Sequence, residues 1–141
     1  MESVELFTYI ILRTFHGQRG VKAMQIISID ASVGKETTIE DSTFLLTPII
    51  RNAGHIRMVS IFLEVEQTIP YREASVDQLV IIVRGNGWVQ VENSEQTPLV
   101  PGQAAFFPEG EYHVIGTEEG LVAFIIEGVD LYDTIPLLYS R

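Results

Sequence analysis

A histidine late in the chain stands in a segment that is rich in glycine and proline. Gly102 is followed after five residues by Pro108, then by Gly110, and three residues later by His113. Imidazole exchanges a proton near neutral pH and binds transition metals, so this residue type at a fixed spacing suggests chemistry. Two interpretations of His113 stay open. It contacts a ligand or acts as a general base, or it is a remnant hydrogen-bonded to a polar neighbour such as Gln78 or Tyr71.

The segment from Gly102 to Thr117 resembles the second motif of the cupin superfamily, a glycine, five residues, P-x-G, two residues and a histidine. The family usually has Asn at the last position, where this chain has Thr117. The resemblance extends over about half of the chain, residues 56–128. It implies a jelly-roll barrel, and a metal bound by His113 together with two histidines and a glutamate from a first motif.

The first motif keeps its frame in this chain and loses its metal ligands. Counting back from Gly85, the resemblance places the glutamate position at Gln78. The two histidine positions fall on one of two pairs, according to the gap: Arg72 and Ala74, or Tyr71 and Glu73. Neither pair contains an imidazole, and a guanidinium repels a metal ion. We therefore expect no cofactor and no usual metal centre.

The side chains that remain at these positions are the candidate ligand-binding residues. They are Tyr71, Glu73, Gln78 and His113. Glu73 with His113 could hold a divalent metal weakly. Arg72 could bind an acidic ligand through its forked donors. Among the nearby acids, we expect Glu73 and Asp77 to be solvated, because charged side chains are mostly exposed.

The pattern from Met24 onward predicts a single all-β domain. Runs rich in Val, Ile, Phe and Thr alternate with Gly, Pro, Asn and Asp, and this spacing favours a sandwich or barrel. With the resemblance, the prediction is an antiparallel jelly-roll β-barrel, the double-stranded β-helix, over residues 24–141. Strands are predicted over 24–29, 44–50, 56–65, 78–84, 88–92, 104–107, 112–115 and 121–127.

The two ends of the chain are expected to be peripheral. Residues 1–23 form an N-terminal extension or a covering element, and their apolar run over 6–12 is too short to cross a bilayer. A helix is possible over 1–15 or over 131–138, where Pro136 would interrupt it.

Asn86-Gly87 predicts a tight hairpin, because this dipeptide tolerates positive φ. The strand before it is apolar throughout, from Leu79 to Val83, and Leu121 to Ile126 is likewise continuous. A barrel interior covers only one face of each strand. The other face needs a cover, from the N-terminal segment or from a second copy, and the prediction is a homodimer.

Composition excludes several classes of partner and site. The net charge is −10 and the pI is about 4.6, so nucleic acid and anionic membrane surfaces are disfavoured as partners. The chain has no cysteine, so it has no disulfide, thiolate metal site or catalytic thiol, and a cytoplasmic location is expected.

Three functions remain open. The first is a small-molecule-binding barrel without the usual metal site. The second is an isomerase, epimerase or dioxygenase-like enzyme with an atypical metal shell, or without metal, with His113 as base and Tyr71 as acid. The third is a structural barrel with a filled cavity that acts through its dimer surface. The fold alone does not decide among them.

Overall fold

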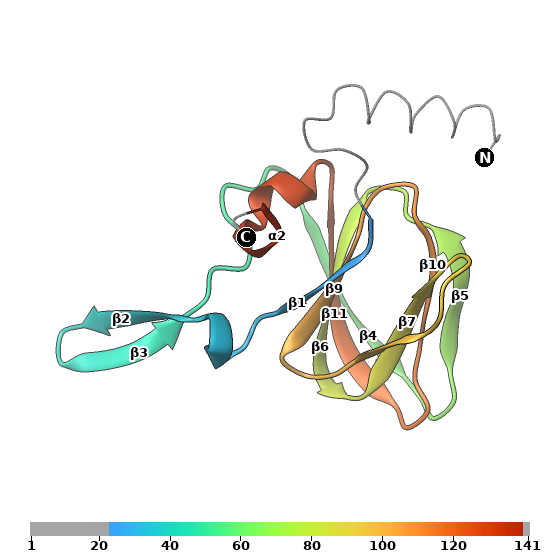
Figure 1. Ribbon diagram of the computed structural model, residues 1–141, viewed down its shortest axis with the longest axis horizontal. Coiled ribbons are helices and arrows are strands. Elements are labelled where there is room, and N and C mark those ends of the chain that lie inside the picture. Colours follow the sequence, from blue (N-terminus) through green and yellow to red (C-terminus); the bar gives the residue numbers. More distant parts are fainter. Residues whose placement is uncertain (1–22, 140–141) are drawn as a thin grey trace.

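The computed structural model describes residues 23–139, so nearly all of the predicted N-terminal extension lies outside the described residues. A five-stranded antiparallel sheet has the order β1 (Gln25–Ser28), β9 (Gln103–Phe107), β6 (Asp77–Gly85), β11 (Leu121–Gly128) and β4 (Arg57–Leu63). A four-stranded antiparallel sheet has the order β5 (Thr68–Glu73), β10 (Tyr112–Gly116), β7 (Gly87–Val91) and β8 (Thr97–Leu99). The two sheets face each other (Figure 1), and the predicted all-β jelly-roll barrel is confirmed.

The barrel interior is filled by alternate residues of the facing strands. On β11 these are Leu121, Ala123 and Ile125, while the intervening residues point to the outer face. The other sheet contributes Val89 and Ile115 among others. Period-two alternation on facing strands therefore builds one continuous core between the sheets.

The predicted hairpin at Asn86-Gly87 is wrong. β6 and β7 belong to different sheets and do not pair, so the chain turns a corner here from one sheet into the other. The positive φ lies at Gly85, at 85°, and a Cβ there would stand 2.2 Å from the carbonyl oxygen of Gly120. A glycine is needed because the β10–β11 turn packs directly against this corner.

Three strands were not predicted from the sequence. β5 and β8 contain Pro70 and Pro98, and both strands are edges of the four-stranded sheet, where a missing N–H is tolerated. The third is β2 (Lys35–Ile39), which pairs with β3 (Ser42–Leu46). β3 ends before Pro48, so the strand predicted over 44–50 is found only in its first half.

The β2–β3 arm, residues 35–46, stands apart from the barrel. Its two strands form a separate two-stranded sheet and extend to one side of the molecule (Figure 1). A short 3₁₀ helix, η1 (Ala31–Val33), lies at its base, and the Asp30 side chain caps it by accepting from the N–H of Ser32.

The C-terminal segment covers part of the outer face of the five-stranded sheet. It consists of η2 (Leu131–Thr134) and α2 (Pro136–Tyr139), with Pro136 at the first position of α2. Leu131, Ile135 and Leu138 pack on outward-facing residues of β6, β9 and β11. The sequence analysis expected a partner or the N-terminal segment to cover this face. It did not expect the C-terminal segment, which covers part of the face in the structure. No helix among residues 23–139 is long and apolar enough to span a membrane.

Candidate functional site at one end of the barrel

His113 lies inside the barrel at one end of β10. It is 3% exposed, and its ring stacks on Phe107 with centroids 4.0 Å apart. Its Nδ1 is 3.1 Å from the carbonyl oxygen of Glu111. A carbonyl only accepts, so Nδ1 carries the proton and Nε2 of the neutral ring keeps a lone pair. The predicted remnant partners, Gln78 and Tyr71, do not hold His113.

Burial keeps this imidazole neutral. Desolvation lowers the pKa of His113 below its ordinary value of 6.5, and the nearby charge of Arg72 lowers it further, while the Glu111 carbonyl raises it. The ring is therefore a hydrogen-bond acceptor at neutral pH.

The strand register decides which first-motif residues share the interior with His113. His113 lies directly opposite Arg72 on β5, so the two share a face, and Tyr112 lies opposite Glu73. Tyr71 stacks on Tyr112 at 5.4 Å, with both rings partly exposed. Tyr71 and Glu73 therefore lie on the outer face of β5. Of the two registers left open by the sequence, the structure places the Arg72 register inside.

Gln78 extends the polar end of the interior across the other sheet. On β6 it lies opposite Glu127 of β11 and donates from Nε2 to Oε2 of that carboxylate at 2.7 Å. The other carboxylate oxygen accepts from Arg57 of β4, which lies opposite in the register. The sequence prediction missed Arg57 and Glu127, although Glu127 has the same parity on β11 as the inward Ala123 and Ile125.

Three of these polar residues, Arg72, Gln78 and His113, meet around one small space. It is lined by Ile69, Pro70, Arg72, Gln78, His113, Ile115 and Ile125, and it is too small to hold a water molecule. Arg72 is exposed and has no acidic partner among residues 23–139. Within the same range no hydrogen bond engages Nε2 of His113 or Oε1 of Gln78. One donor group and two acceptors at this end thus have no partner within the described part of the chain.

The side chains at this end do not suit the metal that the cupin resemblance implies. One neutral imidazole and one amide face a guanidinium, and the Glu127 carboxylate is engaged by Gln78 and Arg57, whereas transition metals favour several imidazoles and carboxylates. Glu73, the carboxylate proposed as a weak ligand, lies on the outer face. Among the described residues, no three His, Cys, Asp or Glu side chains are grouped so as to hold a metal ion.

Two other motif residues are structural. Asp77 was expected to be solvated, and this is wrong, because it is 4% exposed. Its two oxygens accept from the backbone N–H groups of Glu109 and Tyr132, which ties the β9–β10 loop to the C-terminal segment. Thr117, at the position where the family has Asn, donates to the carbonyl oxygen of Asn86 at 2.6 Å.

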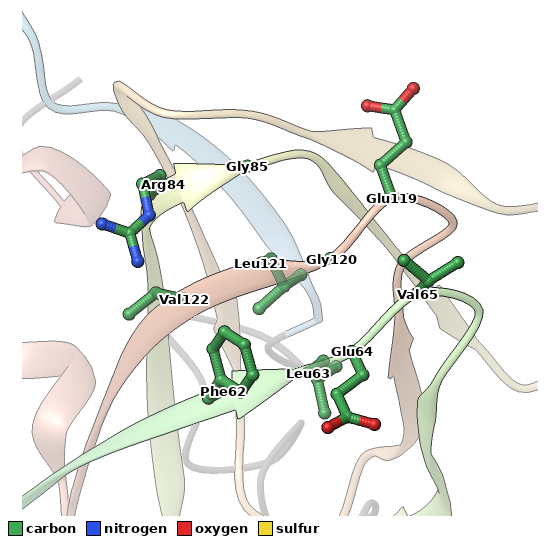
Figure 2. Close-up of a pocket in the computed structure, with 10 residues that line it drawn as sticks. All are labelled: Phe62, Leu63, Glu64, Val65, Arg84, Gly85, Glu119, Gly120, Leu121 and Val122. Carbon is green, nitrogen blue, oxygen red and sulfur yellow. The ribbon is translucent and has the colours of Figure 1, made fainter.

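A groove of about 370 Å³ lies at the opposite end of the barrel, near the β10–β11 turn (Figure 2). Phe62 and Val122 form its apolar wall, with Arg84 beside them and Glu119 on the far side. The groove is open, and the polar groups at the His113 end do not contribute to it.

Solved structures that resemble this chain include proteins described as cupins. A cupin superfamily protein from Desulfitobacterium hafniense matches with a TM-score of 0.50 and 12% identity, over 78% of this chain and 83% of that protein. An RmlC-like cupin family protein with a double-stranded β-helix fold from Methanocaldococcus jannaschii gives 0.51 and 16%, over 67% and 89%. The DMSP lyase DddQ from Ruegeria pomeroyi gives 0.50 and 17%, over 62% of this chain and 42% of the lyase.

No protein-family model matches the sequence, and no curated protein matches it either. At identities below 20% the structural likeness shows the fold alone. Together with the sheet order and the second-motif glycines, it shows that this chain has the cupin fold, a double-stranded β-helix.

Proposed function

We propose that this protein is a small-molecule-binding barrel that takes up a hydroxycarboxylate at the end where Arg72, Gln78 and His113 meet. The observation that carries the proposal is a set of polar groups on the inner face that have no partner among residues 23–139. Arg72 offers forked donors without an acidic partner among the described residues, and forked donors match a carboxylate. Nε2 of His113 and Oε1 of Gln78 are acceptors, which a ligand hydroxyl can satisfy.

Arg72 must move for a ligand to enter, since the space between these side chains does not hold even a water molecule. Its side chain is exposed and long, so swinging outward breaks no ion pair with the described residues. Arg72 would thus act as a movable cover whose guanidinium follows the ligand carboxylate. The supporting chemistry needs no metal, in keeping with a donor set that lacks the usual ligands.

Calorimetric titration with a series of small hydroxycarboxylates, each paired with its amide, tests the proposal. The acids should bind and the amides should bind more weakly. Arg72→Met should weaken binding by about tenfold to a hundredfold, because a hydrogen bond to a charged group contributes about 1.5–3 kcal/mol. The matched control is Arg84→Met, an exposed arginine at the groove of Figure 2, which should leave affinity unchanged. Binding that Arg72→Met leaves intact would contradict the proposed site.

The same titration with manganese, iron and zinc distinguishes the enzyme alternative. Tight stoichiometric binding that disappears in His113→Ala would favour a metalloenzyme over a binding module. The metal-free alternative, with His113 as base and Tyr71 as acid, loses support because these side chains lie on opposite faces of the β5–β10 pair.

A structural barrel is the second candidate, and one observation favours it. Phe107 and the residues around it fill the interior, and the space beside His113 is closed. This candidate predicts that no hydroxycarboxylate binds, while the association of copies persists. The two functions therefore give opposite results in the calorimeter.

A further inference from the structure

The β2–β3 arm presents an apolar face that its own barrel does not cover. The register places Ile39, Phe44 and Leu46 on one face of the arm, where they are 59%, 39% and 43% exposed. Thr38 and Thr43 lie on the other face with their hydroxyls 2.9 Å apart, and Glu36 and Leu45 share that face. The first face thus carries three of the four large apolar side chains of the arm, and a lone two-stranded ribbon is marginally stable in water. The arm therefore needs a surface to pack against.

A second apolar surface lies on the outer face of the five-stranded sheet. The outer patch consists of Met58 and Phe62 on β4 and Val83 on β6, which are 54%, 65% and 45% exposed. The C-terminal segment packs on the same face and leaves these three residues uncovered. β4 is also an edge strand, with one side unpaired within the described sheet. The patch is thus open to another strand.

We infer that the β2–β3 arm of one chain packs on the outer patch of a second copy, and that the second arm returns the contact. The arm and the C-terminal segment extend from the same side of the barrel (Figure 1), and the outer face lies on that side. A two-fold axis can then satisfy both contacts at once, as an isologous dimer requires. The lengths also agree: five residues of β3 and the stretch from Met58 to Phe62 each span roughly 15 Å at about 3.3 Å per residue.

Charge supports a second copy as the occupant. The turn of the arm carries Glu40 and Asp41, both exposed. Arg84 lies beside Phe62 at the edge of the patch and has no acidic partner among residues 23–139. Glu64 and Glu119 line the other end of this groove, away from the Arg84 head (Figure 2). An acidic arm tip at Arg84 would therefore pair opposite charges next to an apolar contact.

Disulfide trapping on the full chain tests the exchange, because the chain has no cysteine of its own. Ile39→Cys chains with an affinity tag are mixed with untagged Phe62→Cys chains, equilibrated and oxidised. The expected product is a tagged–untagged dimer linked by a disulfide. Thr38→Cys, on the opposite face of the arm, is the matched control and should give little of it. An equal yield from both arm positions would overturn the inference. A chain that carries both Ile39→Cys and Phe62→Cys and forms its disulfide within itself would also overturn the inference.

The mass in solution gives an independent readout. The full chain should have about twice 15.8 kDa by light scattering at micromolar concentration. Phe44→Glu should produce a monomer, whereas Thr43→Glu adds the same charge on the other face and should leave the dimer. Arg84→Glu should weaken the dimer, and adding Glu40→Lys and Asp41→Lys to it should restore association. A monomeric wild-type chain, or a Phe44→Glu chain that stays dimeric, would refute the exchange.

Discussion

Both faces of the five-stranded sheet carry clusters of apolar side chains, and the two faces differ sharply in how they are covered. The inner face packs on the four-stranded sheet, and Val80, Ala123 and Phe107 on it are essentially inaccessible. Within residues 23–139, the C-terminal segment covers the outer face over Leu79 and Phe106, Ile49 and Ile50 pack against the same cluster, and the face is open at the outer patch. The inner cover is therefore a property of the fold, while the outer cover is assembled from separate segments.

This difference predicts which substitutions should change the stability of a single chain and which should change association. An inner residue contributes to the stability of each chain by itself, because its neighbours belong to the same barrel. An outer residue contributes to the stability of a single chain where the C-terminal segment or the stretch with Ile49 and Ile50 packs on it. Elsewhere on that face, the expected contribution is to association, and it depends on protein concentration. Substitutions on the two faces can separate these cases.

The largest difference is expected between two phenylalanines. Phe107→Ala empties a fully buried position on the inner face and removes the ring that stacks on His113, so it should lower the free energy of unfolding by about 3–5 kcal/mol. Phe62→Ala on the outer face should cost less than about 0.5 kcal/mol in the monomer. Urea unfolding at several protein concentrations measures both. Equal losses at high dilution would remove the distinction between the faces.

The C-terminal cover is expected to have the next largest effect. Ile135 is fully buried against the outer face, so Ile135→Ala should lower the free energy of unfolding by about 2–4 kcal/mol. Val129→Ala, in the exposed link that leads to this segment, is the matched control and should stay within about 0.5 kcal/mol. Similar losses in the two variants would mean that the segment contributes little to covering the sheet.

Much of the fold could be predicted from the sequence, because alternation and glycine spacing are local signals. Continuous apolar strands correctly indicated that both faces of β6 and β11 need a cover. The identity of the cover could not be predicted, because it depends on where the chain leads after β11. The corner at Gly85 was mistaken for a hairpin because the sequence does not show which strands pair. A positive-φ glycine serves a tight turn and a passage between sheets equally well, and only strand pairing separates them.

The four candidate site residues divide into two pairs in the structure. Gln78 and His113 are found on the inner face, and their contact with a ligand stays a prediction. The choice between Arg72 and Tyr71 could not be made from the sequence, since a shift of one residue moves every side chain of a strand to the opposite face. Pairing of His113 with Arg72 makes that choice in the structure. Asp77 was misjudged because its partners are backbone groups, which leave no sequence signal.

The smallest expected effects are two opposite dependences of stability on pH, one from His113 and one from Glu111. Burial lowers the pKa of His113 below 6.5. The unfolded chain therefore binds more protons than the folded chain as the pH falls below 6.5, and stability decreases on acidification until the folded pKa is reached. Burial raises the pKa of Glu111 above 4.5, against a weaker lowering by a backbone hydrogen bond from Met24. The folded chain then keeps its proton as the pH rises above 4.5, and stability decreases on alkalinisation through the raised pKa.

Single variants should separate these two slopes. His113→Gln should remove the loss of stability below pH 6.5 and leave a stability that falls as the pH rises from 4.5. Glu111→Gln should do the reverse. Its amide stays neutral, so no anion can form at the buried Oε1 position, which lacks a hydrogen-bond partner among the described residues. Phe62→Ala, on the outer face, should leave the pH profile unchanged. Urea midpoints measured from pH 4.5 to 8 test both slopes. Parallel profiles for all three variants would mean that the burial of neither His113 nor Glu111 changes the number of protons bound on folding.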